Sequence, residues 1–241
     1  MKKFLNIKNK SLRMKLETKH FIIIHSLDAR IVSDFSKSAE KKYEDVYSNL
    51  NFLKKPKKKI KIVLCKTFKE FSFVKKYLSS WRWSQGWGGD KQISLNLKRI
   101  AEKGEFETDS YDFVASSYVT SIIGHELVHA FLGRTLCETK DFPVWLNEGL
   151  AEYIGENARE IKKVHKLLRF SNVVGRRHLC YEEEYDQATN MVIFLANKYG
   201  KKKLFEFLKN CQKLKSFKRA FNKIYDTDFR NFEDCFLKSS R

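Results

Sequence analysis

The stretch SIIGHELVHAFLGR, residues 121–134, constrains this chain most because it places two histidines four residues apart in an apolar segment. Four residues of an α-helix turn the chain by about 400°, so His125 and His129 leave nearly the same face, one turn apart. Glu126 is rotated by about 100° from His125, where its carboxylate could reach a water held by a shared metal ion. The spacing is typical of metal-assisted hydrolysis.

A third ligand is the feature that separates this interpretation from chance, since short motifs have false matches and most helical histidines are ordinary surface or core residues. A catalytic Zn²⁺ normally has three protein ligands and one open position. The segment WLNEGLAEY offers Glu148 and Glu152, which lie on one face of a predicted helix. Such pairs are common on solvated surfaces, but this segment is apolar and aromatic. Because unpaired carboxylates are costly to bury, a nearby cation would explain them.

At these residues the chain resembles the gluzincin metallopeptidases, zincins whose third zinc ligand is a glutamate. The resemblance is to the aminopeptidase N-like and minimal gluzincin (peptidase MA-like) branch. It lies in HELVH followed, after eighteen intervening residues, by Glu148. The resemblance implies one Zn²⁺ per chain bound by His125, His129 and Glu148, with Glu126 as the general base.

The same resemblance gives Glu152 a supporting role. It implies that Glu152 accepts a hydrogen bond from the back of a ligand histidine, His125, which fixes the histidine tautomer and raises its basicity. The neighbouring metzincin class fails, because its longer motif needs glycine and histidine where this chain has Leu132 and Thr135.

Further features of the resemblance concern the transition state and the substrate. The segment YDQATNMVIFLANKYG places Tyr185 where the family often has a tyrosine that stabilises the oxyanion. The alternatives are a packing tyrosine at a helix start and His178 as the donor. In GWGGD, residues 86–90, Gly88 and Gly89 would let a substrate backbone approach closely, or would simply form a turn. The strand after GWGGD corresponds to the family's substrate-binding edge strand, but the exopeptidase motif of the aminopeptidases is absent.

The order of predicted elements indicates an α+β fold. Residues 20–26 and 59–65 are β-branched runs that predict strands, each followed by a helical pattern. Residues 93–97 alternate and predict a strand with one solvated face. Everything after residue 187 is helical in pattern. We expect a zincin-like α/β subdomain over residues 1–135, with a small mixed sheet and the HExxH helix. A helical subdomain over residues 136–241 would supply the third ligand.

The charge of the chain supports a second function class. The formal net charge is +19, and lysines cluster at residues 54–61 and 198–204. Such a surface is either simply solvated or binds a polyanion. The alternative function is therefore a basic protein that binds nucleic acid or an acidic partner, with an inactive or structural zinc site. No cysteine or histidine follows the motif at structural-zinc spacing, however, and Glu126 would then have no chemical task.

Sequence patterns also bear on location. No apolar run approaches the roughly 20 residues that span a bilayer, and the N-terminal residues lack the features of a signal peptide. The five cysteines are scattered without a C-x-x-C pair, as expected of reduced thiols. We therefore expect a cytoplasmic zinc metallopeptidase that acts on a peptide or protein substrate. It uses a zinc-activated water with Glu126 as the base, or is held latent by its own segment WRWSQGWGG.

Overall fold

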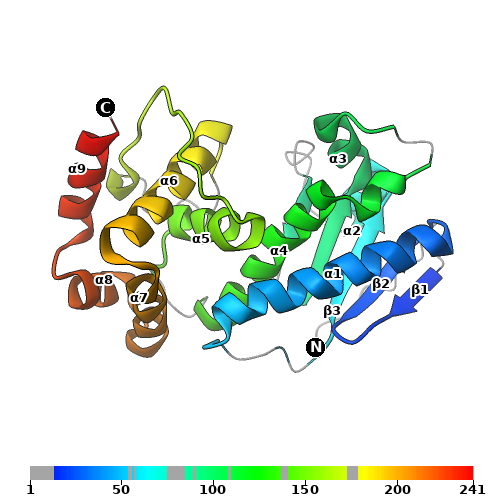
Figure 1. Ribbon diagram of the computed structural model, residues 1–241, viewed down its shortest axis with the longest axis horizontal. Coiled ribbons are helices and arrows are strands. Elements are labelled where there is room, and N and C mark those ends of the chain that lie inside the picture. The colour runs from blue at the N-terminus through cyan, green and yellow to red at the C-terminus, as the bar shows by residue number, and fades with distance from the viewer. Residues whose placement is uncertain are drawn as a thin grey trace. The chain divides into compact units, whose positions relative to one another are not determined.

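The computed structural model describes residues 14–53, 56, 58–74, 85–88, 91–107, 110–136, 141–172 and 179–240 (Figure 1). Its fold is α+β, as predicted, with one mixed sheet and a mainly helical C-terminal half. Contacts between residues divide the chain into two compact units. The first comprises residues 1–45 and 56–130, and the second comprises residues 46–55 and 131–241.

The first unit contains a five-stranded sheet in the order β1-β2-β3-β5-β4. Strands β2, β3 and β5 are parallel, whereas β1 and β4 are antiparallel to their neighbours. The predicted strands at residues 20–26, 59–65 and 93–97 are confirmed, and two short edge strands join them. The bounds are β1 Met14–Glu17, β2 Phe21–His25, β3 Ile60–Cys65, β4 Gly86–Gly88 and β5 Gln92–Asn96.

Both faces of this sheet are covered. Helix α1 (Ala29–Leu50) runs across one face in Figure 1, where Tyr43 packs edge-on against Phe21 of β2 at 5.7 Å between ring centroids. Helix α2 (Phe68–Val74) covers the other face, where Phe71 packs on Val63 and Cys65 of β3. Parallel strands buried on both faces are expected to be rich in Val, Ile and Leu, as IKIVLC in β3 is.

Strand β5 corrects two expectations. It is not an edge strand, because it pairs with β3 on one side and with β4 on the other. Nor does it have a solvated face, since Ser94 and Asn96 are 0% and 2% exposed. Asn96 instead accepts a hydrogen bond from the backbone N–H of Arg99 and so caps α3 (Leu97–Gly104). The glycine-rich segment expected to form a turn supplies the real edge strand, β4.

The helix that carries HELVH is α4 (Ser117–Leu136), preceded by the 3₁₀ turn η1 (Asp112–Ala115). It is apolar on nearly every side, with Val119, Ile123, Leu127 and Val128 fully buried. A helix of this kind lies in a protein interior, and polar residues on it need partners or a ligand.

The second unit is helical, as the sequence pattern predicts. Pro143 caps α5 (Val144–Leu150), which continues directly into the π-helix η2 (Ala151–Glu156). Trp145 of α5 stacks on Phe170 and Phe229 in an aromatic core. The remaining elements are η3 (Phe170–Asn172), α6 (Glu182–Tyr199), α7 (Lys201–Leu214), α8 (Phe217–Tyr225) and α9 (Phe229–Ser239).

Candidate metal centre

The two histidines of the motif face each other on α4. The Nε2 atoms of His125 and His129 are 3.0 Å apart, and both side chains are half-buried. Two ligand atoms at 2.0–2.1 Å from a tetrahedral metal ion lie about 3.3 Å apart. The observed separation is close to that value, so the helix already presents both nitrogens in a suitable arrangement.

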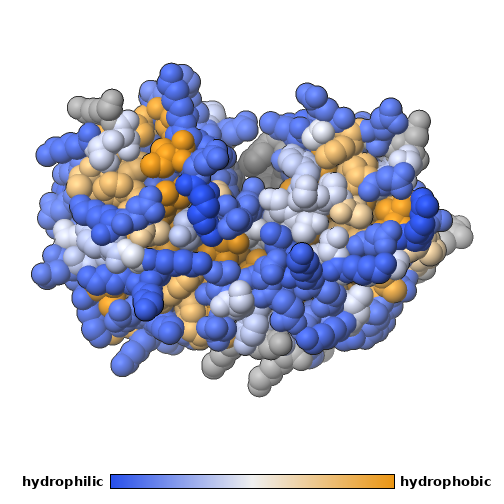
Figure 2. All heavy atoms as spheres, viewed as in Figure 1, coloured by the Kyte–Doolittle hydropathy of each residue, from blue (hydrophilic) through white to orange (hydrophobic). Residues whose placement is uncertain are grey.

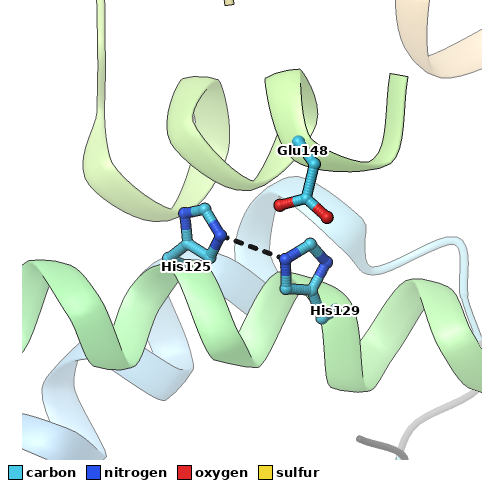
Figure 3. Close-up of side chains that lie close together, drawn as sticks. All are labelled: His125, His129 and Glu148. Carbon is cyan, nitrogen blue, oxygen red and sulfur yellow. Dashed lines mark hydrogen bonds between the residues drawn. The ribbon is translucent and has the colours of Figure 1, made fainter. Parts of the chain in front are cut away.

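Glu148 of α5 completes a three-residue cluster with these histidines. One ligand atom from each of His125, His129 and Glu148 lies within 4.8 Å of the others. Figure 3 shows the Glu148 carboxylate turned toward the two imidazole rings. The three residues could therefore hold a metal ion, as the sequence predicted. Two imidazoles and one carboxylate form a donor set known from catalytic zinc sites, and three protein ligands leave a coordination position open.

Gly149 allows the α5 backbone next to Glu148 to lie close to α6. A Cβ atom built at Gly149 would collide with the backbone carbonyl of Ala188 and would lie 2.8 Å from Cγ2 of Val192. The clash with Ala188 is with backbone, which cannot rotate away as a side chain can. The glycine in NEG therefore serves the packing that places the third candidate ligand.

The carboxylate of Glu126 lies against strand β4 of the sheet. Its side chain is buried, with 6% of the residue exposed. A Cβ built on Gly86 of β4 would lie 2.7 Å from Oε1 of Glu126, and one built on Gly88 would lie 2.5 Å from Oε2. The Glu126 carboxylate is thus packed against the backbone of β4. The residue before it in the sequence, His125, is one of the candidate metal ligands.

Glu152 lies in the π-helix and is 8% exposed. Its carboxylate accepts a hydrogen bond from the hydroxyl of Thr189 at 2.6 Å, and the ammonium of Lys162 is 3.6 Å away. Asn190 fixes Lys162 by two hydrogen bonds to its backbone. A cation beside Glu152 was expected, and the structure identifies one as a lysine. The predicted hydrogen bond from a ligand histidine to Glu152 stays a prediction.

Electrostatics keep Lys162 charged in this position. Burial works to lower the pKa of Lys162, but a hydrogen bond to Asp186 at 2.6 Å and the carboxylate of Glu152 raise the pKa above its ordinary value. The side chain of Lys162 is half exposed, so solvent screens part of this attraction.

Replacing Glu152 with alanine is expected to weaken zinc binding by about 10–100-fold, as loss of a hydrogen-bonding partner behind a ligand typically does. Titration with a competing chelator measures this change. Asp186→Asn is the matched control, because Asp186 also pairs with Lys162 but no ligand role is assigned to it. Unchanged zinc affinity in the Glu152 variant would reduce that residue to a partner of Thr189 and Lys162.

Of the remaining predicted residues, the structure describes Tyr185 and Gly88. Tyr185 is the fourth residue of α6, is half-buried, and its backbone carbonyl lies 3.0 Å from the Thr189 hydroxyl. Gly88 ends β4. Gly89 and the rival donor His178 lie outside the described residues.

Sequence reasoning missed four residues that shape this region: Gly86, Gly149, Lys162 and Thr189. Only the first had a usable signal. Residues two apart in a strand share a face, so Gly86 and Gly88 together lie against Glu126. The other three act through contacts between elements distant in sequence, which no local pattern reports.

The basic residues spread over the surface. Helices α7 and α8 carry eight lysine or arginine residues and one acidic residue, Glu206, and all nine side chains are exposed. Figure 2 shows hydrophilic residues over most of the face in view. Among the described residues, no helix is both long and apolar enough to span a membrane.

Comparison of the chain with models of known protein families and with curated protein sequences found no match. The function must therefore be inferred from the residues and their arrangement.

Proposed function

We propose that the protein is a zinc metallopeptidase of the gluzincin type, with a zincin-like fold. The observation that carries this proposal is the convergence of His125, His129 and Glu148 on one point, next to a buried glutamate. A two-histidine, one-carboxylate set also suits Fe²⁺ in oxygenases. Glu126 favours zinc, because hydrolysis needs a general base beside the metal and oxygen activation by iron does not.

A zinc ion bound to these three residues would lower the pKa of a water molecule to ≈ 7 and polarise the substrate carbonyl. Glu126 would accept a proton from the attacking water as its oxygen bonds to the carbonyl carbon. The same carboxyl group would then give that proton to the amine as the C–N bond breaks. Glu126 thereby returns to its carboxylate form, and the net reaction is hydrolysis of the peptide bond.

Tyr185 would donate a hydrogen bond to the carbonyl oxygen as negative charge develops there. Such preorganised donors act mainly in the transition state. The start of α6 that carries Tyr185 is held by Glu184, whose buried carboxylate accepts from the backbone N–H of Cys180 at 2.6 Å. This contact gives the tyrosine a fixed backbone.

The edge strand β4 suits an extended peptide as the substrate. The backbone N–H of Asn96 donates to the carbonyl of Gln85. Because hydrogen-bonded and non-hydrogen-bonded pairs alternate in antiparallel pairing, Gly86 and Gly88 direct their backbone groups away from β5. A substrate strand added to that edge would follow a common mode of peptide recognition.

A structural zinc site is the competing interpretation of the same ligands. Structural zinc ions are normally enclosed by four protein ligands. Within the part of the chain that the structure describes, the candidate group contains only three metal-binding side chains. The three-ligand set favours a catalytic centre.

Digestion of a peptide library, read by mass spectrometry, tests the function. We expect the zinc-loaded protein to cleave internal peptide bonds, a chelator to stop cleavage and added Zn²⁺ to restore it. Cleavage that survives complete zinc removal, or zinc-loaded protein that cleaves no peptide, would contradict the proposed function.

A further inference from the structure

The glycines of β4 face α4 rather than the open edge of the sheet. Alternate residues of a strand point to opposite faces, so Gly86 and Gly88 share one face and Trp87 lies on the other. Trp87 packs against Val63, Cys65 and Phe71 on the α2 side. The face left to the two glycines is therefore the one toward α4.

The space that two side chains would occupy on this face is filled by Glu126. At Gly86, a Cβ would meet Oε1 of Glu126 at 2.7 Å, its Cγ at 3.2 Å and Cγ2 of Ile122 at 3.2 Å. At Gly88, a Cβ would meet Oε2 at 2.5 Å, and also the backbone carbonyl oxygen of Glu126 at 2.6 Å. Cβ atoms essentially never approach other atoms below 3.0 Å. Any other residue at either position would displace Glu126 or β4.

We propose that Gly86 and Gly88 are positioning residues for Glu126, and that the missing side chains set where its carboxylate is held between α4 and β4. The catalytic consequence rests on the proposed function, but the packing does not. This differs from the expectation that glycine here admits the substrate. The Cβ direction is perpendicular to the sheet and toward Glu126, whereas a substrate strand would approach in the plane of the sheet.

The kinetic test uses Gly86→Ala in the zinc-loaded protein. A displacement of about 1 Å of a catalytic group can cost about 10²-fold in rate, so kcat should fall by that order. KM and zinc content should change little, because the substitution removes no zinc ligand and no backbone hydrogen-bonding group of β4. Trp87→Phe, on the opposite face of the same strand, is the control and should keep kcat. A Gly86 variant with full kcat would overturn the positioning role.

Thermal unfolding tests the packing without any peptidase assay. Gly86→Ala should lower the melting temperature by about 5 °C, as overpacking in a domain of this size does. In a Glu126→Ala background the loss of melting temperature should largely disappear, because two of the three atoms that crowd a Cβ at Gly86 belong to the Glu126 side chain. Gly88→Ala should remain destabilising there, because its clash with the Glu126 carbonyl remains.

These two tests separate the positioning role from the proposed function. An equal loss of melting temperature for Gly86→Ala in both backgrounds would contradict the positioning role, whatever the protein cleaves. Coupling between Gly86 and Glu126 in a protein that hydrolyses no peptide would support the packing and reject the peptidase.

Discussion

Glu126→Gln is expected to abolish measurable peptide cleavage while zinc stays bound. The amide has nearly the shape of the carboxylate and fits the same space against β4, but it cannot accept the proton of the attacking water. General base catalysis contributes about 10²–10⁴-fold, and the residual rate should fall below detection in a peptide assay. Single-turnover kinetics and elemental analysis of the same sample measure both parts of this result.

The control for Glu126 is another buried carboxylate of the same unit. Glu70 of α2 is 7% exposed and accepts a hydrogen bond from the backbone N–H of Lys66, with no assigned part in catalysis. Glu70→Gln should keep activity at temperatures where the protein stays folded. Full activity in the Glu126 variant would exclude Glu126 as the base.

Tyr185→Phe is expected to lower kcat by about 10²–10³-fold, the usual cost of losing one oxyanion donor, with KM and zinc content nearly unchanged. The substitution removes only the hydroxyl oxygen and leaves the aromatic ring in place. Steady-state kinetics on a peptide identified in the library digest provide the measurement.

His178→Ala is the matched variant for the tyrosine. The proposal expects it to retain kcat, because Tyr185 supplies the donor. Loss of kcat in the His178 variant together with full kcat in Tyr185→Phe would exchange the two roles. The zinc ligands and Glu126 would not be affected by that outcome.

The parts of the fold that could be predicted from the sequence are those fixed by local periodicity. Isoleucine-rich runs at β2 and β3, and helical spacing after residue 187, are patterns that one element determines by itself. Strand β4 was missed because three residues with two glycines resemble a turn more than a strand. The burial of Ser94 and Asn96 in β5 could not be foreseen, because a separate element, helix α2, covers that face of the sheet.

In the candidate site, too, only the features set by a single element could be predicted from the sequence. The approach of His125 to His129 follows from helix geometry alone, because residues four apart must lie one turn apart. The residues of WLNEGLAEY made both Glu148 and Glu152 candidates for the third ligand, and the resemblance selected Glu148, since no local pattern links this segment to HELVH. The contacts of Glu152 with Thr189 and Lys162 join three separate segments, so only the structure reveals them.

The central claim is that His125, His129 and Glu148 bind one catalytic zinc, and metal analysis of the purified full chain tests it most directly. The protein is loaded with Zn²⁺, dialysed against metal-free buffer and compared with His129→Ala treated in parallel. The proposed site predicts one zinc per chain in the natural sequence and a loss of zinc in the variant. A chain that takes up no zinc, or a variant that keeps its full zinc content, would contradict it.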